Sequence, residues 1–249
     1  MFQAFSNTQY RWLWAHTLLN ASGRTLEQMS TGWAALEVTD SAFWVGMATG
    51  MRGIGMVSFS LVGGVIADRI DRRKLLIFIQ GTRMLLGFAL GVLFLTDRME
   101  LWHLLLGSLI QGLLMPMNLA SRNTLTLDLV GREALLNAIA FNMAAFNLMR
   151  IISPTAGGLI ITAVGTGGVF FMMGASDALG VVFLLLMGKP PRSVRRRESV
   201  LANLREGLGF VAHHRPIRSL LTFSFVMETF AFSYHAMLSV IARDVLEVG

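Results

Sequence analysis

One short stretch decides how this chain folds: Gly64-Val65-Ile66-Ala67-Asp68-Arg69-Ile70-Asp71-Arg72-Arg73-Lys74. Six of its last seven residues are charged, yet residues 43–67 contain only the charge of Arg52, and residues 75–95 contain only that of Arg83. About 20 apolar residues are enough for one helix to cross a bilayer, and a backbone that faces lipid must be helical. The stretch is therefore predicted to be a tight basic turn between two transmembrane helices.

The rest of the chain repeats this alternation of apolar runs and short polar connections. Hydrophobic residues make up 54% of the sequence and charged residues 14%, against ~45–50% and ~25% in soluble domains. Runs long enough to span a bilayer occupy residues 12–36, 43–66, 75–95, 101–121, 135–164, 168–188 and 217–241. The pattern predicts an all-α protein, a polytopic bundle of transmembrane helices bound to a lipid bilayer.

The chain has no cysteine, which excludes disulfides, thiolate metal sites and a thiol nucleophile. Its N-terminus, Met1 to Tyr10, has neither a basic head nor a cleavage site, so no removable signal peptide is predicted. The only adjacent histidines, His213 and His214, lack a third ligand nearby in the sequence. We expect no metal and no cofactor.

The positive charges predict the orientation in the membrane. Fifteen of the 21 lysines and arginines, Arg122 among them, fall at the N-terminus or in every second connection, and two fall on the opposite side. Positively charged loops stay in the cytoplasm. We expect a multi-pass protein of the bacterial inner membrane with a cytoplasmic N-terminus. The net charge of +6 then reflects topology rather than nucleic-acid binding, because it is spread over short loops.

Three regions are predicted along the chain: a six-helix bundle over 1–188, a basic cytoplasmic linker over 189–216, and a seventh transmembrane helix within 217–249. In the linker, apolar residues recur at helical spacing (Leu201, Leu204, Leu208 and Val211). This segment is either an amphipathic helix on the inner membrane surface or a solvated tether.

The sequence of the basic turn resembles the signature loop of the major facilitator superfamily, G-x-x-x-D-R-x-G-R-[RK]. Asp71 stands where glycine is usual, a substitution found in the branch that includes the enterobactin exporter. Further motifs of that branch are Arg11-Trp12-Leu13-Trp14, Asp128-Leu129-Val130, Leu135-Leu136-Asn137-Ala138 and Ala242-Arg243-Asp244-Val245-Leu246. Ser153-Pro154-Thr155-Ala156-Gly157-Gly158 resembles the G-P-x-x-G-G element of drug–proton antiporters, but Ser108 stands where that family often has an arginine.

The resemblance implies the N-terminal six-helix half of a twelve-span transporter plus its seventh helix, so that the C-terminal half would be a missing partner. Such transporters rock two halves around a central site. The resemblance also implies a conformational latch made by the basic turn and a carboxylate beyond the fourth span: Gly64, Asp68, Arg69, Arg72, Arg73 and Asp128. Asp68 could accept a hydrogen bond from Arg72. Alternatively, the arginines only fix the orientation.

Polar residues inside the spans are the candidates for substrate or proton coupling, because burying them in lipid is costly. The candidates are Asn20, Arg24, Glu27, Gln111, Asn118, Arg150, Asp177 and Glu228. Arg24 and Glu27 can pair at i, i+3. The alternative reading is that Asp177 and Glu228 are ordinary residues near helix ends and that Arg150 stabilises carbonyls freed by a kink. Pro154, Gly157 and Gly158 form the candidate helix-kink element.

No catalytic or nucleotide-binding motif is present, so the chain is not expected to be an enzyme or to be driven by ATP. The sequence predicts a secondary transporter, best read as a proton-coupled exporter of small amphiphilic or aromatic compounds such as siderophores or drugs. Carboxylates shielded from water can exchange protons near neutral pH. Two alternatives stay open: a carrier of lipids or sugars on the same fold, and a truncated membrane protein that does not transport.

Overall fold

The computed structural model describes residues 3–188, 214–227 and 241, and within these residues the chain forms helices and no strand. The elements are η1 (Gln3–Ser6), α1 (Thr8–Thr39), α2 (Ala42–Arg69), α3 (Arg72–Leu95), α4 (Leu101–Val130), α5 (Leu135–Val164), α6 (Thr166–Leu186) and α8 (Arg215–Val226). The predicted all-α fold is confirmed. The predicted linker over 189–213 and most of the seventh span lie outside the described residues.

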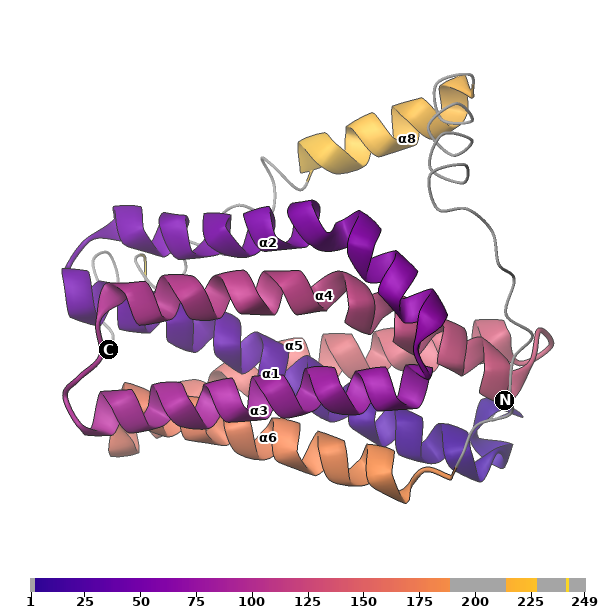
Figure 1. Cartoon of the computed structure of the whole chain (residues 1–249), viewed down its shortest axis with the longest axis horizontal. Coiled ribbons are helices and arrows are strands. Elements are labelled where there is room, and N and C mark those ends of the chain that lie inside the picture. The colour runs from indigo at the N-terminus through magenta and orange to yellow at the C-terminus, as the bar shows by residue number, and fades with distance from the viewer. Residues whose placement is uncertain (1–2, 189–213, 228–240, 242–249) are drawn as a thin grey trace.

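The six helices α1 to α6 run alongside one another as a single bundle (Figure 1). Among the described residues, α3, α4, α5 and α6 are long and apolar enough to cross a membrane by length and composition. The helix α1 packs against α5 and α6, and α2 packs against α4, so the first two helices belong to the same bundle. The bundle is that of a multi-pass membrane protein, as predicted.

The contact between α2 and α4 brings two helix backbones unusually close together. A Cβ atom on Gly55 would lie 2.6 Å from the carbonyl oxygen of Leu109, and one on Gly112 would overlap the carbonyl oxygen of Arg52. Small residues permit such approaches between membrane helices. The two glycines therefore fix Arg52 of α2 against the middle of α4.

The basic turn is as tight as its sequence predicts, because only Ile70 and Asp71 separate α2 from α3. Asp71 caps the start of α3, and its side chain accepts a hydrogen bond of 3.0 Å from the backbone N–H of Lys74. Aspartate is a favoured N-cap residue. This role accounts for an aspartate at a position where the family signature has glycine.

The fourth span differs from the prediction, since α4 continues nine residues past residue 121, to Val130. Polar residues in this extension satisfy their hydroxyl groups within the helix: Thr124 donates to the carbonyl of Ala120, and Thr126 to that of Arg122. Arg122, counted above among the inner-loop charges, is therefore a helix residue and only 6% exposed. Its assignment to a loop is wrong.

Candidate functional site

A cavity of about 90 Å³ lies among α1, α2, α3, α4 and α5. Its lining residues are Asn20, Arg24, Glu27, Arg52, Ile79, Arg83, Gln111, Leu114, Met115, Asn118, Leu119, Arg122 and Phe146. Most of them lie far from the ends of their helices, at the depth where a polar side chain is most costly in a bilayer. Five of the predicted coupling residues come together here: Asn20, Arg24, Glu27, Gln111 and Asn118.

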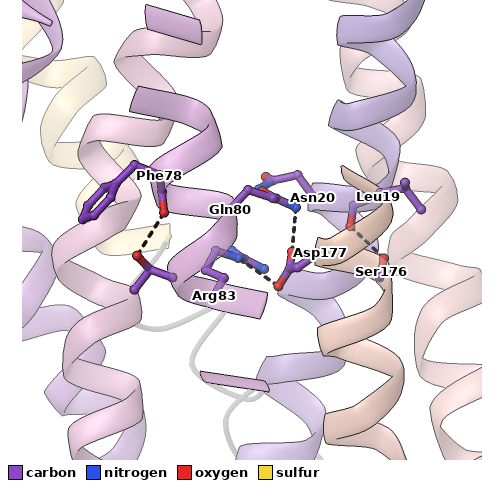
Figure 2. A network of polar contacts seen from close by, with 8 residues as sticks. Leu19, Asn20, Phe78, Gln80, Arg83, Ser176 and Asp177 are labelled. Atoms are coloured by element: carbon purple, nitrogen blue, oxygen red, sulfur yellow. Dashed lines mark hydrogen bonds and ion pairs between the residues drawn. The ribbon is translucent and has the colours of Figure 1, made fainter. Parts of the chain in front are cut away.

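A buried polar network joins α1, α3 and α6 beside this cavity (Figure 2). Gln80 donates a 2.7 Å hydrogen bond to the Oδ1 atom of Asp177 and accepts one of 3.0 Å from Asn20. The Nε atom of Arg83 lies 3.3 Å from the Oδ2 atom of Asp177. Asp177 is fully buried in the middle of α6, so the alternative placement near a helix end does not apply. Asn20 and Arg83 also line the cavity, and the network therefore reaches it.

Glu27 forms an ion pair across two helices rather than along one. Its carboxylate pairs with the guanidinium group of Arg52 on α2, while the sequence pointed to Arg24 as its partner. The hydroxyl of Thr31 lies 3.5 Å from the same carboxylate oxygen. The partner differs because the glycines of the α2–α4 contact bring Arg52 to the cavity, a placement that residue spacing along α1 does not reveal.

Arg122 lies in the cavity wall without a carboxylate partner among the described ion pairs. Its Cζ atom sits 4.5 Å from the ring centroid of Phe146, a distance at which a cation is attracted to an aromatic face. Its Nε and Nη1 atoms are buried and have no hydrogen-bond partner among the described residues. Arg24, half-buried in the same wall, has no ion pair among them either.

The remaining coupling candidates do not line the cavity. Arg150 is exposed on α5. Glu228 lies outside the described residues. Among the described residues, Asp177 is connected to the cavity through Arg83 and through the amide side chains of Gln80 and Asn20.

The candidate kink element of α5 forms a contact surface with α1. A Cβ atom on Gly157 would meet the sulfur of Met29 at 3.1 Å, whereas one on Gly158 would meet only the end of Met29 at 3.9 Å. Ser153 donates a 3.1 Å hydrogen bond to the hydroxyl of Ser22. The helix continues through Pro154 from Leu135 to Val164, so the described role of this element is close packing.

The latch residues lie at one end of the bundle. Arg72 forms an ion pair with Asp128 at the end of α4, and Arg73 donates hydrogen bonds of 2.7 and 2.9 Å to the carbonyls of Leu184 and Leu185 at the end of α6. Arg69 is exposed, and a Cβ atom on Gly64 would meet no atom within 4 Å. The side chain of Asp68 is not among the described ones, and Arg72 pairs with Asp128.

Four residues of the site were not selected from the sequence: Arg52, Gln80, Arg83 and Arg122. A usable signal existed for two of them. Arg52 and Arg83 are lone charges within apolar runs, and such a charge requires a partner of opposite sign in another span. Glu27 and Asp177 are the carboxylates that fill this need.

The chain matches the family model described as transmembrane secretion effector over residues 1–249. The chain belongs to this family of the major facilitator superfamily. It is 29% identical over 185 residues to the enterobactin exporter EntS of Shigella flexneri, covering 74% of this chain and 45% of the relative. It is 32% identical over 177 residues to EntS of Escherichia coli O1:K1, covering 70% of this chain and 42% of the relative.

These similarities confirm the predicted superfamily and its enterobactin-exporter-like branch. They also confirm a membrane bundle of the major facilitator type. The chain spans less than half the length of the curated relatives that it matches. The family and these relatives are transporters, not enzymes.

Proposed function

We propose that this chain is the N-terminal part of a proton-coupled exporter of small amphiphilic or aromatic compounds that works by alternating access. The observation that carries the proposal is the polar cavity among α1 to α5, lined by four arginines and a glutamate in the interior of a membrane bundle. Charged residues at such depth are costly and are retained for substrate or ion pathways. The exporter relatives support the same direction of function.

Asp177 is the residue through which we propose that protons act. It is fully buried, and its charge is balanced by Arg83 at 3.3 Å. Protonation of Asp177 would remove this balance. The positive charge of Arg83, which also lines the cavity, would then be available to a ligand there. Because a ligand shifts a conformational equilibrium only through different affinities for its states, this exchange of partners would couple the proton to the substrate.

The Arg72–Asp128 pair is the proposed conformational latch. It ties the start of α3 to the end of α4, and Arg73 ties the same turn to the end of α6. These contacts hold the ends of three helices together. Such a connection is strong enough to favour one state and weak enough to release in the other, which needs only a few kcal/mol at most.

The orientation and the regions of the chain belong to the same proposal. The N-terminus, the basic turn and the end of α4 lie at one end of the bundle, where Asn7 donates a 2.6 Å hydrogen bond to the carbonyl of Leu129. We place this end in the cytoplasm of a bacterial cell, with the bundle in the inner membrane. Residues 189–216 would then be a cytoplasmic linker to a second half that begins with 217–249.

Transport by everted membrane vesicles tests the proposal. The chain is expressed together with the C-terminal half of the E. coli relative, and uptake of a fluorescent aromatic dye is followed under an imposed proton gradient. We expect uptake that stops when a protonophore collapses the gradient, and that Asp177→Asn abolishes. Uptake that continues without the gradient would contradict proton coupling. Absence of uptake for every compound of a panel, with both halves present in the membrane, would contradict transport.

A further inference from the structure

We infer that the cavity among α1 to α5 binds an organic anion, a ligand with an acidic group such as a carboxylate attached to an apolar or aromatic body. This inference deepens the proposed function, on which it rests for the role of the site, by naming the substrate class. It is carried by an excess of positive charge and of hydrogen-bond donors in the described cavity wall.

The charge of the wall is unbalanced. Four guanidinium groups line the cavity, those of Arg24, Arg52, Arg83 and Arg122. Two carboxylates compensate for them: Glu27 pairs with Arg52, and Asp177 pairs with Arg83. Arg24 and Arg122 remain without an anionic partner among the described ion pairs. Because arginine stays charged at any physiological pH, the cavity wall has two positive charges that no carboxylate of the described residues pairs with.

The hydrogen-bonding capacity is unbalanced in the same direction. Six buried nitrogen atoms of the lining residues have no hydrogen-bond partner among the described residues: Arg52 Nε, Arg83 Nη2, Gln111 Nε2, Asn118 Nδ2, Arg122 Nε and Arg122 Nη1. All six are donors. No acceptor oxygen of the lining residues is left unsatisfied in this way. A buried donor without a partner is costly, so the wall is complementary to a ligand that brings acceptors.

The apolar part of the wall indicates what the acidic group is attached to. Ile79, Leu114, Met115 and Leu119 line the cavity together with the ring of Phe146. Phe146 also holds the guanidinium group of Arg122 by its face, at 4.5 Å. This contact compensates the charge of Arg122 in part, while the Nε and Nη1 atoms have no hydrogen-bond partner among the described residues. A buried guanidinium group with unpartnered N–H donors can form charge-assisted hydrogen bonds to a carboxylate.

A structural role alone does not account for these features. A residue kept only to stabilise the bundle would have its donors satisfied, as those of Arg73 are by the carbonyls of Leu184 and Leu185. Arg122 is nearly as buried as Asp177, yet its Nε and Nη1 donors have no hydrogen-bond partner among the described residues. The difference separates an arginine that holds helices together from one that is available to a ligand.

Binding of a matched pair of probes to the purified chain in detergent tests the inference. The probes are 2-naphthoate and 2-naphthamide, which share a ring system and differ in the negative charge. We expect 2-naphthoate to bind about tenfold or more tightly than 2-naphthamide, since hydrogen bonds to a charged group are stronger than those to a neutral one. Arg122→Gln should abolish this preference by weakening the binding of 2-naphthoate and leaving that of 2-naphthamide unchanged.

Two further variants keep the test decisive. Arg132→Gln removes the same charge from an exposed position outside the cavity and should keep the full preference. Arg24→Gln changes a half-buried lining residue and should reduce the preference even if Arg122→Gln does not fold. Equal affinity for the two probes, no binding of either, or a preference that survives Arg24→Gln would overturn the inference.

The outcome is separable from that of the proposed function. If the protein takes up dyes in a proton-driven manner but does not prefer the anionic probe, the proposed transport is supported and the anionic substrate class is contradicted. If the protein prefers the anionic probe but transports no compound in vesicles, the anion-binding site is supported and the proposed transport is contradicted.

Discussion

The basic end of the bundle and its central cavity are both rich in arginine, but the arginines differ in whether their donors have partners. At the end, Arg72 has Asp128, and Arg73 has the carbonyls that terminate α6. In the cavity, Arg122 stacks on Phe146 with two donors unpartnered among the described residues. The side chains of the Arg72–Asp128 pair are 19% and 16% exposed, so water screens them.

The comparison separates two uses of one residue type. Where donors are satisfied and water is near, an arginine connects helix ends at a low energetic cost. Where donors exceed acceptors and the side chain is buried, the charge is expensive, and its presence points to a ligand. The following predictions test this difference, starting with the largest expected effect.

The strongest effect is expected in the interior, at Asp177. The substitution Asp177→Asn keeps the shape of the side chain but leaves Arg83 buried without an anion. Breaking a buried pair in this way costs about 3–5 kcal/mol, and we expect a loss of that order in the free energy of unfolding. Denaturant titration of the purified chain in detergent micelles, followed by tryptophan fluorescence, measures it.

The control removes the second charge as well. Arg83→Met combined with Asp177→Asn retains an acceptor for Gln80 and leaves no unpaired buried charge, so it should recover most of the lost stability. A double variant as unstable as Asp177→Asn alone would mean that the pair does not act as a unit.

A smaller loss is expected where the α2–α4 contact places Arg52 at the cavity. The substitution Gly112→Ala puts a methyl group onto the carbonyl oxygen of Arg52, and overpacking of this kind costs about 1–3 kcal/mol. The matched control is Gly53→Ala, because a Cβ atom there meets nothing within 4 Å. Thermal unfolding in detergent should show a lower midpoint for the first variant only. Equal midpoints would contradict the described contact.

The smallest change in stability is expected at the basic end. Arg72→Gln, Asp128→Asn and the double variant form a thermodynamic cycle, and for a partly exposed pair the coupling should be about 1 kcal/mol or less. Transport in vesicles should nevertheless fall for each single variant if the pair is the proposed latch, while Arg132→Gln leaves it unchanged. A coupling of several kcal/mol would remove the distinction between the two regions.

The sequence predicted the fold well and the site in part. Every segment that crosses lipid must be apolar and helical, so the apolar runs predicted where the helices lie. The predicted limits 135–164, for example, match α5. The limit of α4 was missed because six of the ten residues 121–130 are polar, and in sequence such a stretch resembles a loop. That error also counted Arg122 among the loop charges.

Asn20, Arg24 and Glu27 of α1, and Gln111 and Asn118 of α4, recur at helical spacing within their spans and were predicted as coupling residues. The structure brings these five residues to one cavity. Helical periodicity is sufficient for that prediction, since it depends on one helix at a time. The partners across helices were not predictable in the same way. The pairing of Glu27 with Arg52 depends on how closely α2 approaches α4. The spacing of residues along one helix carries no information on the distance between two helices.

The central claim, a positively charged cavity inside the bundle, can be tested with a single introduced thiol, because the chain has no cysteine. Met115→Cys places a thiol in the cavity wall, and Thr96→Cys places one at the exposed end of α3. The rates of reaction with an anionic and a cationic methanethiosulfonate reagent are compared. We expect the anionic-to-cationic rate ratio at Met115→Cys to exceed that at Thr96→Cys by about tenfold or more, and Arg122→Gln to lower it. Equal ratios at the two positions, or faster reaction of the cationic reagent in the cavity, would contradict the account.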